Sequence, residues 1–358
     1  MNKKIVFLLV VSIVFSCFAA TGFAAAKTGS TITLDGKTLN AISYLPDDEY
    51  YANTVYLPLR AISEALGYKV SWSSKDQAVV VSNQNKKIII DQVNDNIKSF
   101  NLKNNSKHEY FMGMPIVYKN VTYVPQNFFM EEFNLKIDWD KKTGNVEMET
   151  VKQNSINIIS KAEEIDTKEI YTKLQYPQLD GLENKTVQNK INSTFKKLAE
   201  DAEVMGMDAL VDIDPSYFEG HRFGVDLNYQ VKYNQNGLLS VVFDNYQYYG
   251  GAHGSTLQTA YTFNLKDGTE YKLSDMFKDK TDYVTLMSNQ VKQQLKERGL
   301  SEGVEFDRIA EDQEFYLDNN GIKVYFQQYA IGAYALGILE FEADYSDVRD
   351  VLNTAIGI

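Results

Sequence analysis

The sequence predicts an α+β protein with two domains. The first half contains a self-match in which residues 56–72 align without gaps with residues 123–139. The second half contains apolar strands joined by hairpin signals, with a few amphipathic helices between them. Runs of strands interrupted by helices favour separate layers over a regular alternation of strand and helix. We expect a small antiparallel sheet packed on short helices in the first domain. In the second we expect a larger antiparallel sheet with helices on one face.

Residues 1–26 have the features of a secretory signal. Two lysines precede an apolar run over residues 5–15, and small residues then end in an A-x-A cleavage site. We expect cleavage after Ala26 and a mature chain that is secreted or associated with the cell wall. An alternative interpretation is a lipoprotein signal in which a lipidated Cys17 stays at the membrane. Phe15 is bulky for that motif, so we favour full cleavage.

The mature chain is expected to contain no cysteine, because Cys17 is the only one in the sequence. We therefore expect neither disulfides nor a thiolate metal site, and a fold stabilised by ordinary core burial. No later stretch has the roughly 20 apolar residues that cross a bilayer, which predicts no transmembrane segment after signal cleavage.

Composition indicates a folded, acidic protein. Of 358 residues, 44% are hydrophobic and 23% are charged, which is too apolar for a disordered chain. The net charge of -12 excludes a nucleic-acid binder, because phosphate recognition needs clustered Lys and Arg. The first domain, residues 27–150, has 14 Lys and Arg against 15 Asp and Glu, whereas the second, residues 151–358, has 20 against 33. This excess predicts either a solvated surface or electrostatic steering of a cationic partner.

Each copy of the repeat is interpreted as a strand end, a short helix and an alternating strand that carries a tryptophan. Pro58 is expected at the first helical position, where no N–H is missed, and Gly67 ends the helix. Trp72 and Trp139, the only tryptophans, fall at equivalent places and are interpreted as core residues. A short helix gains its stability from tertiary packing. We expect both helices to pack on one sheet, built from residues 32–34, 79–81, 88–90, 116–118 and 146–148.

The pattern Tyr-Leu-Pro-Leu-Arg-Ala-Ile-Ser-Glu-Ala-Leu-Gly of the first copy, followed by Val-Ser-Trp, resembles the copper amine oxidase N-terminal (stalk) domain of exported bacterial proteins. In the second copy Gln-Asn replaces the usual Leu-Arg, and Asn134 replaces the usual glycine. The resemblance covers residues 30 to 150 and implies a small antiparallel sheet wrapped around helix that serves as an appendage. It implies no copper, because His108 is the only histidine there and one imidazole makes no copper site.

The second domain alternates hairpins with helices. Residues 183–204 and 283–298 have helical periodicity, and Ser274 is expected to cap a short helix. Turn signals of the Asn-Gly and Asp-Gly type separate paired strands. The expected strands are residues 156–159, 170–176, 223–233, 238–248, 260–265, 269–273, 315–317, 322–326 and 338–341.

Several sequence elements of this domain resemble one family. A Tyr-Pro pair at residues 176–177, ahead of an Asn-rich helix, is similar to DUF4163. The run Tyr-Tyr-Gly-Gly-Ala-His-Gly at residues 248–254 and Leu-Ser-Asp-Met-Phe at residues 273–277 are similar to DUF3298. Together they resemble the extracellular part of RsiV-like anti-sigma factors and the front part of PdaC-like peptidoglycan deacetylases. RsiV-like ectodomains bind lysozyme, so the resemblance implies a strongly basic partner, in agreement with the acidic charge.

The sequence shows no catalytic motif. His108, His221 and His253 have no metal-ligand spacing, and neither a G-x-S-x-G elbow nor a phosphate-binding loop occurs. We expect no enzymatic activity, no metal and no cofactor. His253 lies between glycines at a strand end, with Asp244 nearby in the sequence, and is interpreted as part of a tight turn.

Tyrosines near this turn form the expected binding surface, because tyrosine supplies contact area with little loss of entropy. The alternative is that these rings belong to the core, since alternating strand residues divide between core and surface. The candidate binding residues are Tyr246, Tyr248, Tyr249, Gly250, Gly251, His253, Tyr329 and Tyr334, with Tyr325 beside them. We predict a non-enzymatic cell-envelope protein that binds a basic protein such as lysozyme, or peptidoglycan. The alternatives are an accessory protein of peptidoglycan modification, associated with a deacetylase or hydrolase, and a structural wall protein.

Overall fold

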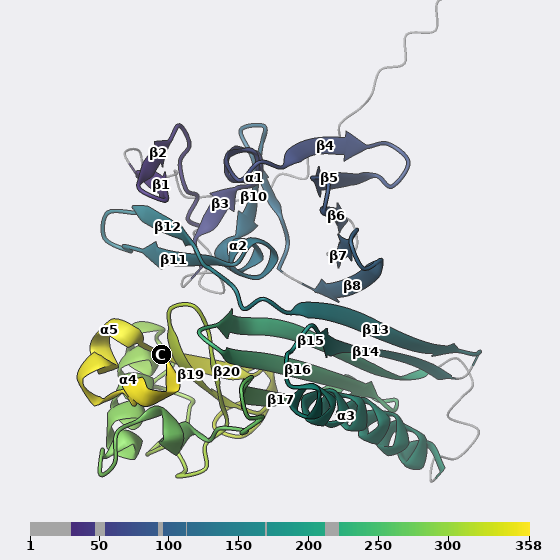
Figure 1. The fold of residues 1–358 in the computed structure, drawn as a ribbon, viewed down its shortest axis with the longest axis vertical. Helices are drawn as coiled ribbons and strands as arrows, with labels where there is room; N and C mark the ends of the chain where they lie inside the picture. Colours follow the sequence, from purple (N-terminus) through teal and green to yellow (C-terminus); the bar gives the residue numbers. More distant parts are fainter. Residues whose placement is uncertain (1–29, 47–53, 92–95, 112, 169, 212–221) are drawn as a thin grey trace, which may run out of the picture.

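The computed structural model describes residues 30–46, 54–91, 96–111, 113–168, 170–211 and 222–358, with the backbone alone at residues 209–211. The predicted signal of residues 1–26 and His221 lie outside these ranges. Figure 1 shows an N-terminal region (residues 30–150) that lies on a C-terminal region (residues 151–358). Both regions contain strands and helices, which confirms the α+β class. Among the described helices, none combines the length and apolar character needed to span a membrane.

The two copies of the repeat form equivalent strand–helix–strand units. Their elements are β3 (Tyr56–Pro58), α1 (Leu59–Ala65) and β4 (Lys69–Ser73), and β10 (Val121–Pro125), α2 (Gln126–Phe133) and β11 (Leu135–Trp139). The copies meet where β3 and β10 pair antiparallel. Pro58 caps its helix, one position earlier than predicted. Gly67 and Asn134 both follow their helices with positive φ, so asparagine replaces glycine at an equivalent helix stop.

The described strands of the N-terminal region form three sheets instead of the single sheet that we expected. Their orders are β11-β12-β1-β2, β3-β10-β9 and the meander β4-β5-β6-β7-β8. The further strands are β1 (Ile32–Leu34), β2 (Lys37–Leu39), β5 (Ala78–Ser82), β6 (Lys86–Asp91), β7 (Asn96–Asn101), β8 (Ser106–Phe111), β9 (Ile116–Tyr118) and β12 (Val146–Thr150). The single sheet is absent because the two copies of the repeat send their last strands, β4 and β11, into different sheets.

The two tryptophans of the repeat have different environments. Trp139 is half-buried against the apolar core, whereas Trp72 is 57% exposed. The interpretation of Trp72 as a core residue is therefore wrong. Because β4 is an edge strand of the meander, this ring has a neighbouring strand on one side alone.

A five-stranded sheet of order β13-β14-β15-β16-β17 forms the centre of the C-terminal region. Its strands are β13 (Asn157–Asp166), β14 (Ile170–Asp180), β15 (Phe223–Gln235), β16 (Leu238–Tyr248) and β17 (Ser255–Asn264). β14 and β15 run parallel, so the sheet is mixed where we expected an antiparallel one. The helix α3 (Lys185–Val211) lies between these strands in sequence and covers one face of the sheet (Figure 1), burying Val187, Ile191 and Phe195. A parallel pair requires such a crossover.

A second sheet, of order β18-β19-β20, completes the C-terminal region. Its strands are β18 (Phe315–Leu317), β19 (Gly321–Phe326) and β20 (Leu339–Asp344). The α-helices of this part are α4 (Tyr283–Glu297) and α5 (Tyr345–Val348). Its short 3-10 helices are η3 (Leu273–Met276), η4 (Tyr334–Leu336), η5 (Arg349–Val351) and η6 (Thr354–Ile356). α4 packs on β20, where Gln294 Nε2 donates to Glu342 O at 2.6 Å. Lys272, not Ser274, is the N-cap of η3, and its N–H donates to Asp275 Oδ2 at 2.8 Å.

A polar interface joins the two regions on the sheet face opposite α3 (Figure 1). Gln175 exchanges two hydrogen bonds with the main chain of Glu109 on β8, at 2.6 and 2.9 Å, and Asn228 Nδ2 donates to Glu109 O at 2.5 Å. Lys232 Nζ lies 2.8 Å from Glu131 Oε1, and both side chains are largely buried. The interface buries main-chain N–H and C=O groups away from water, and side-chain amides supply their hydrogen bonds. Because these bonds are directional, the two regions have a defined relative orientation.

Candidate functional site

A glycine-rich turn between β16 and β17 supplies the first part of the candidate site. Gly250 and Gly251 have φ angles of +89° and +93°, which residues with a Cβ rarely adopt. Gly254 is buried, and a Cβ built on it would lie 2.4 Å from the ring of Tyr246. The first two positions therefore need glycine for their backbone conformation, and the third needs it for space.

His253 and Tyr334 are held together at this turn. Their rings stack with centroids 3.8 Å apart and planes 21° apart. Tyr334 Oη donates to Gly254 O at 2.8 Å, and His253 Nδ1 lies 2.9 Å from the same oxygen. A carbonyl oxygen accepts and cannot donate, so Nδ1 carries the proton and Nε2 is the acceptor of the neutral ring. The imidazole stays exposed while both rings are fixed by one carbonyl.

Tyr329 adds an exposed ring to this group. Its side chain is 63% exposed, and its ring centroid lies 5.5 Å from that of Tyr334. Its φ of +67° places a bulky residue in the left-handed region, where strain is stored. Gln327 and Gln328 tie this loop to β17, because their side-chain oxygens accept from two main-chain N–H groups of that strand at 3.0 and 2.8 Å.

The structure brings together some of the predicted binding residues and separates others. We define the aromatic cluster as Tyr246, His253, Tyr329 and Tyr334. Tyr248 donates from Oη to Gly251 O at 3.0 Å within the glycine-rich turn. Tyr249 lies toward α3, with its Oη close to Gly206. Tyr325 is fully buried and donates from Oη to Glu314 Oε1 at 3.2 Å, so it is a core residue and not part of the exposed surface.

The aromatic cluster lies in two segments without charged residues. Residues 245–265 and residues 324–339 contain no Asp, Glu, Lys or Arg, although 23% of the whole chain is charged. These segments present aromatic rings, amide side chains and main-chain polar groups. The two segments that carry the cluster are therefore uncharged, and the nearest charge given by the sheet register is Asp226 on β15, opposite Tyr246.

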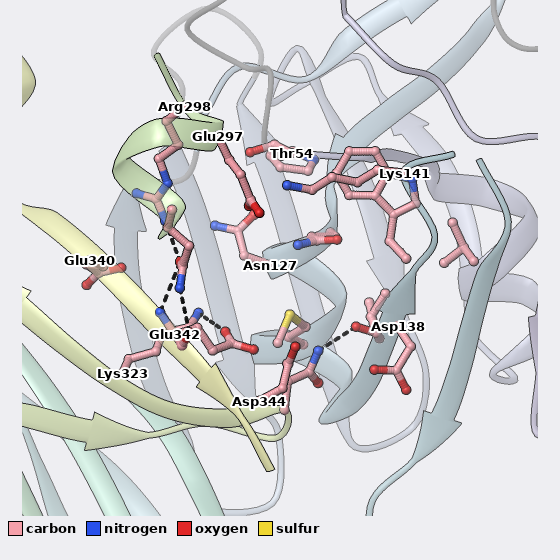
Figure 2. A pocket seen from close by; sticks show the side chains of 18 of the residues that line it. Thr54, Asn127, Asp138, Lys141, Glu297, Arg298, Lys323, Glu340, Glu342 and Asp344 are labelled. Carbon is pink, nitrogen blue, oxygen red and sulfur yellow. Dashed lines mark hydrogen bonds and ion pairs between the residues drawn. The ribbon is translucent and has the colours of Figure 1, made fainter. Parts of the chain in front are cut away.

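A cleft of about 1610 Å³ between the two regions is a second candidate site. Its acidic lining residues are Asp138, Asp140, Glu147, Glu297, Glu340, Glu342, Asp344 and Asp347, and its basic ones are Lys141, Arg298 and Lys323. Figure 2 shows Glu297 and Glu340 on one side and Thr54 and Lys141 opposite them, so both regions form its walls. We call this space the acidic cleft.

Alternate residues of β20 give one wall of the acidic cleft its charge. Glu340, Glu342 and Asp344 line the cleft, while the residues between them are buried in the core. Lys323 Nζ lies 2.7 Å from Asp318 Oδ2 and 3.1 Å from Glu342 Oε2. Burial raises the pKa of Glu342 to about 8, and burial together with neighbouring carboxylates raises the pKa of Asp344. One ammonium group does not offset this set of carboxylates, so an added cation would stabilise their charged forms.

The acidic cleft and the aromatic cluster share a boundary at η4. Tyr334 places its ring in the cluster, whereas Ala335 and Leu336 line the cleft. Asp244, which we placed near His253 in the sequence, instead shares an electrostatic interaction with Lys232 at the interface between the regions. Burial raises the pKa of Asp244 to about 6.

Sequence reasoning missed the acidic cleft, because its walls come from both regions and no single segment contains it. One signal was present in the sequence. Glu340, Glu342 and Asp344 alternate from the predicted strand 338–341 onward, and a strand continued to residue 344 places all three side chains on one face. A continuous acidic stripe on one strand could have identified half of the site.

The described residues provide no metal site, since no group of three His, Cys, Asp or Glu side chains among them could hold an ion. His108 belongs to the interface between the regions. Its ring stacks on Tyr229 with centroids 4.3 Å apart, and Nε2 lies 2.8 Å from Asn228 Oδ1. Burial lowers the pKa of His108, so its role in the described structure is that of a neutral packing group.

The chain matches three family models in succession. Residues 34–148 match the copper amine oxidase N-terminal domain, residues 163–256 match deacetylase PdaC, and residues 274–346 match the protein of unknown function DUF3298. The chain therefore carries a copper amine oxidase N-terminal domain followed by PdaC and DUF3298 domains. These matches confirm the copper amine oxidase N-terminal, PdaC and DUF3298 resemblances, whereas the segment that we compared with DUF4163 and the run 248–254 that we compared with DUF3298 both lie within the PdaC match.

Individual proteins are similar to parts of the chain. The peptidoglycan-N-acetylmuramic acid deacetylase PdaC of Bacillus subtilis is 24% identical over 230 residues, which are 61% of this chain and 44% of that protein. The chain thus spans less than half the length of this curated relative. A DUF3298 family crystal structure from Bacteroides fragilis is 23% identical, with a TM-score of 0.44, and covers 57% of this chain and 96% of its own. One from Pseudomonas aeruginosa is 12% identical, with a TM-score of 0.43, and covers 57% and 97%.

Proposed function

We propose that this protein is an exported, non-enzymatic binding protein of the cell envelope whose acidic cleft holds a strongly basic protein of the lysozyme type. The observation that carries the proposal is the lining of the cleft, in which eight acidic side chains stand against three basic ones, with Glu342 largely protonated at neutral pH because its pKa is about 8. Lys323 is already engaged with Asp318 and Glu342. Asp138 also has a partner, Lys136, at 3.1 Å, and the other acidic side chains of the cleft are available to an incoming cationic segment.

The size and polarity of the cleft favour a macromolecular partner. Pockets for small molecules usually have volumes of about 300–1,000 Å³ and mostly apolar walls. The acidic cleft is larger, at about 1610 Å³, and charged residues line it on both sides. A basic segment on the surface of a protein suits this site, because a cleft of one sign of charge attracts the opposite sign and accelerates encounter.

The comparisons support a place in the cell envelope. The matched relative from Bacillus subtilis is named as an enzyme of peptidoglycan. The predicted signal at residues 1–26 adds the expectation of export. A wall-associated protein of this kind would meet basic muramidases in its own compartment.

Calorimetric titration with hen lysozyme tests the cleft. We expect binding that weakens at least tenfold between about 50 and 300 mM salt, because added salt screens the charges of the cleft. The variant Asp138→Asn/Glu147→Gln/Asp347→Asn removes three exposed carboxylates of the cleft, so its fold should persist. At roughly 0.5 kcal/mol a charge, we expect it to bind about tenfold more weakly.

A matched variant separates the cleft from the overall charge of the protein. Glu302→Gln/Glu311→Gln/Asp312→Asn removes the same number of charges from exposed positions that do not line the cleft. We expect it to change the affinity less than about twofold. The absence of heat at low salt, or an equal loss in both variants, contradicts the proposal.

The PdaC match of residues 163–256 favours a second candidate function, an accessory role in peptidoglycan modification. The test is acetate release from purified peptidoglycan by the wild-type chain. The binding proposal predicts no release. Release that is lost in His253→Ala and retained in Trp72→Ala would replace the binding proposal with this second function.

A further inference from the structure

The aromatic cluster is separate from the lining of the acidic cleft, except that Tyr334 begins the turn that bounds both. Its rings are held in place before any ligand arrives. His253 and Tyr334 stack at 3.8 Å and share Gly254 O, and the ring of Tyr246 lies against the same glycine. Rings fixed in this way lose little freedom on binding, which is the property of an effective contact surface.

The backbone of Tyr329 supports a binding role for the cluster. Its φ of +67° is costly for an aromatic residue, and its 63% exposed side chain gains little from core packing. Asparagine or glycine would adopt this conformation more easily. Strain at an exposed position is a feature of functional sites, where the surrounding structure holds a residue in place for contact with a ligand.

The absence of charge determines which class of ligand suits the cluster. Residues 245–265 and 324–339 supply no carboxylate for a cationic protein and no Lys or Arg for a phosphate or an anionic lipid. They do supply flat apolar faces next to amide, hydroxyl and imidazole groups. A neutral ligand with one apolar face and several polar edges matches this combination.

We infer that the aromatic cluster binds the uncharged N-acetylhexosamine rings of a glycan strand. The face of an aromatic ring carries partial negative charge, which attracts the polarised C–H groups on one face of a pyranose ring. The acetamido N–H can donate to His253 Nε2, the acceptor of a ring whose Nδ1 is already bound to Gly254 O. This site goes beyond the proposed function, because it uses a different surface and a different ligand.

Titration with chitotriose, a neutral trimer of N-acetylglucosamine, tests the inference on the wild-type chain. We expect saturation-transfer NMR to place the sugar against tyrosine and histidine rings, and calorimetry to give the same affinity at low and high salt. Tyr329→Ala should weaken binding about fivefold, whereas Tyr329→Phe, which keeps the ring, should stay within about twofold of the wild type.

Trp72→Ala is the matched control, because Trp72 is an exposed aromatic residue of the N-terminal region, at 57%. It should bind chitotriose like the wild type. Asp138→Asn/Glu147→Gln/Asp347→Asn should do the same, whether or not the cleft binds lysozyme, so the two proposals can fail separately.

Three results would overturn the inference. The first is equal affinity for chitotriose in the wild type and in Tyr329→Ala, or no binding at all. The second is binding that is lost at high salt. The third is self-association in analytical ultracentrifugation that Tyr329→Ala abolishes, which would assign the cluster to a second copy of this chain.

Discussion

The aromatic cluster and the acidic cleft lie on opposite sides of η4 and are built differently. The cluster belongs to the C-terminal region alone, contains no charged residue, and is fixed by bonds to main-chain carbonyls. The cleft needs walls from both regions, and carboxylates dominate its lining. The negative net charge of the whole chain therefore matches the acidic cleft and does not match the uncharged aromatic cluster.

Because the two surfaces are built differently, experiments can distinguish ligand binding at one from ligand binding at the other. Binding in the cleft should depend on salt, on pH and on the docking of the two regions. Binding at the cluster should depend on the geometry of its rings and on the acceptor His253 Nε2, and not on salt.

Lys232→Ala should disrupt the docking of the two regions and with it the cleft. Lys232 pairs with Glu131 at 2.8 Å, and its removal leaves a largely buried carboxylate without its cation. We expect the free energy of unfolding in urea to fall by about 3 kcal/mol, with a loss of lysozyme binding and normal chitotriose binding.

Two further variants show whether the buried charge is the cause. Lys232→Met/Glu131→Leu, which removes both charges, should recover most of the stability. Lys292→Ala breaks an exposed pair with Asp307 and should cost less than about 0.5 kcal/mol. If Lys232→Ala were as stable as Lys292→Ala, the interface would not determine the geometry of the cleft.

Glycine to alanine changes should affect the two surfaces unequally. A Cβ at Gly321 would lie 2.3 Å from Ala343 O, a main-chain atom of the strand that forms one wall of the cleft. A Cβ at Gly254 would meet the ring of Tyr246, which is exposed enough to turn away. We expect losses in thermal denaturation of about 2–3 kcal/mol for Gly321→Ala and about 1 kcal/mol for Gly254→Ala.

Sugar binding should rank the two glycine variants in the opposite order to stability, with the larger effect in Gly254→Ala. Gly254→Ala should weaken chitotriose binding severalfold, because the Tyr246 ring moves, and leave lysozyme binding unchanged. Equal effects of Gly254→Ala on both ligands would show that the surfaces are not independent.

The carboxylate of Glu342 should make stability fall as pH rises. Its pKa is about 8 in the folded chain against a usual value of 4.5, so the folded state retains a proton that the unfolded state releases between these values. Unfolding free energy measured in urea should therefore decrease by about 1 kcal/mol or more from pH 5.5 to pH 8. Over the same range the cleft gains negative charge, so lysozyme should bind more tightly.

Glu342→Gln should flatten both trends, whereas Glu302→Gln, at an exposed position, should leave them unchanged. A wild-type protein that becomes more stable between pH 5.5 and pH 8, with the slope unaffected by Glu342→Gln, would contradict the assigned pKa.

Tyr329→Gly should stabilise the fold while it weakens sugar binding. The variant relieves the strain at a φ of +67°, and the exposed ring contributes little to the core. We expect a gain of about 0.5–1 kcal/mol and a rise in Tm of about 1–3 °C, with at least a fivefold loss of chitotriose affinity. A variant that loses both stability and sugar binding would indicate a structural role for this tyrosine.

Local sequence signals predicted the parts of the fold that depend on neighbouring residues. The strand–helix–strand repeat and the hairpin at Asn236 and Gly237 follow from proline, glycine and asparagine at fixed positions, and the structure contains both. The parallel pairing of β14 and β15 was also implied, because the long helix between them allows a crossover. The expected antiparallel sheet rested on hairpin signals, and the other three pairings of this sheet are antiparallel.

Features that depend on distant contacts could not be read from the sequence. The exposure of Trp72 depends on the sheet that β4 joins, and the burial of Tyr325 depends on packing between the two sheets of the C-terminal region. Tyr329 and His253 belong to loops far apart in the chain, and their proximity depends on Tyr334 and Gly254. The cleft requires the docking of two regions and could be anticipated only from the acidic stripe of β20.

The turn Tyr334–Leu336 separates the two surfaces by a few residues, with a phenol ring on one side and aliphatic side chains on the other. Two ligands bound at these surfaces at the same time would be close neighbours. Each would experience an effective concentration of the other far above its concentration in solution. Under the two proposals together, a muramidase and a glycan strand would be held on one molecule, with the enzyme restrained beside the wall.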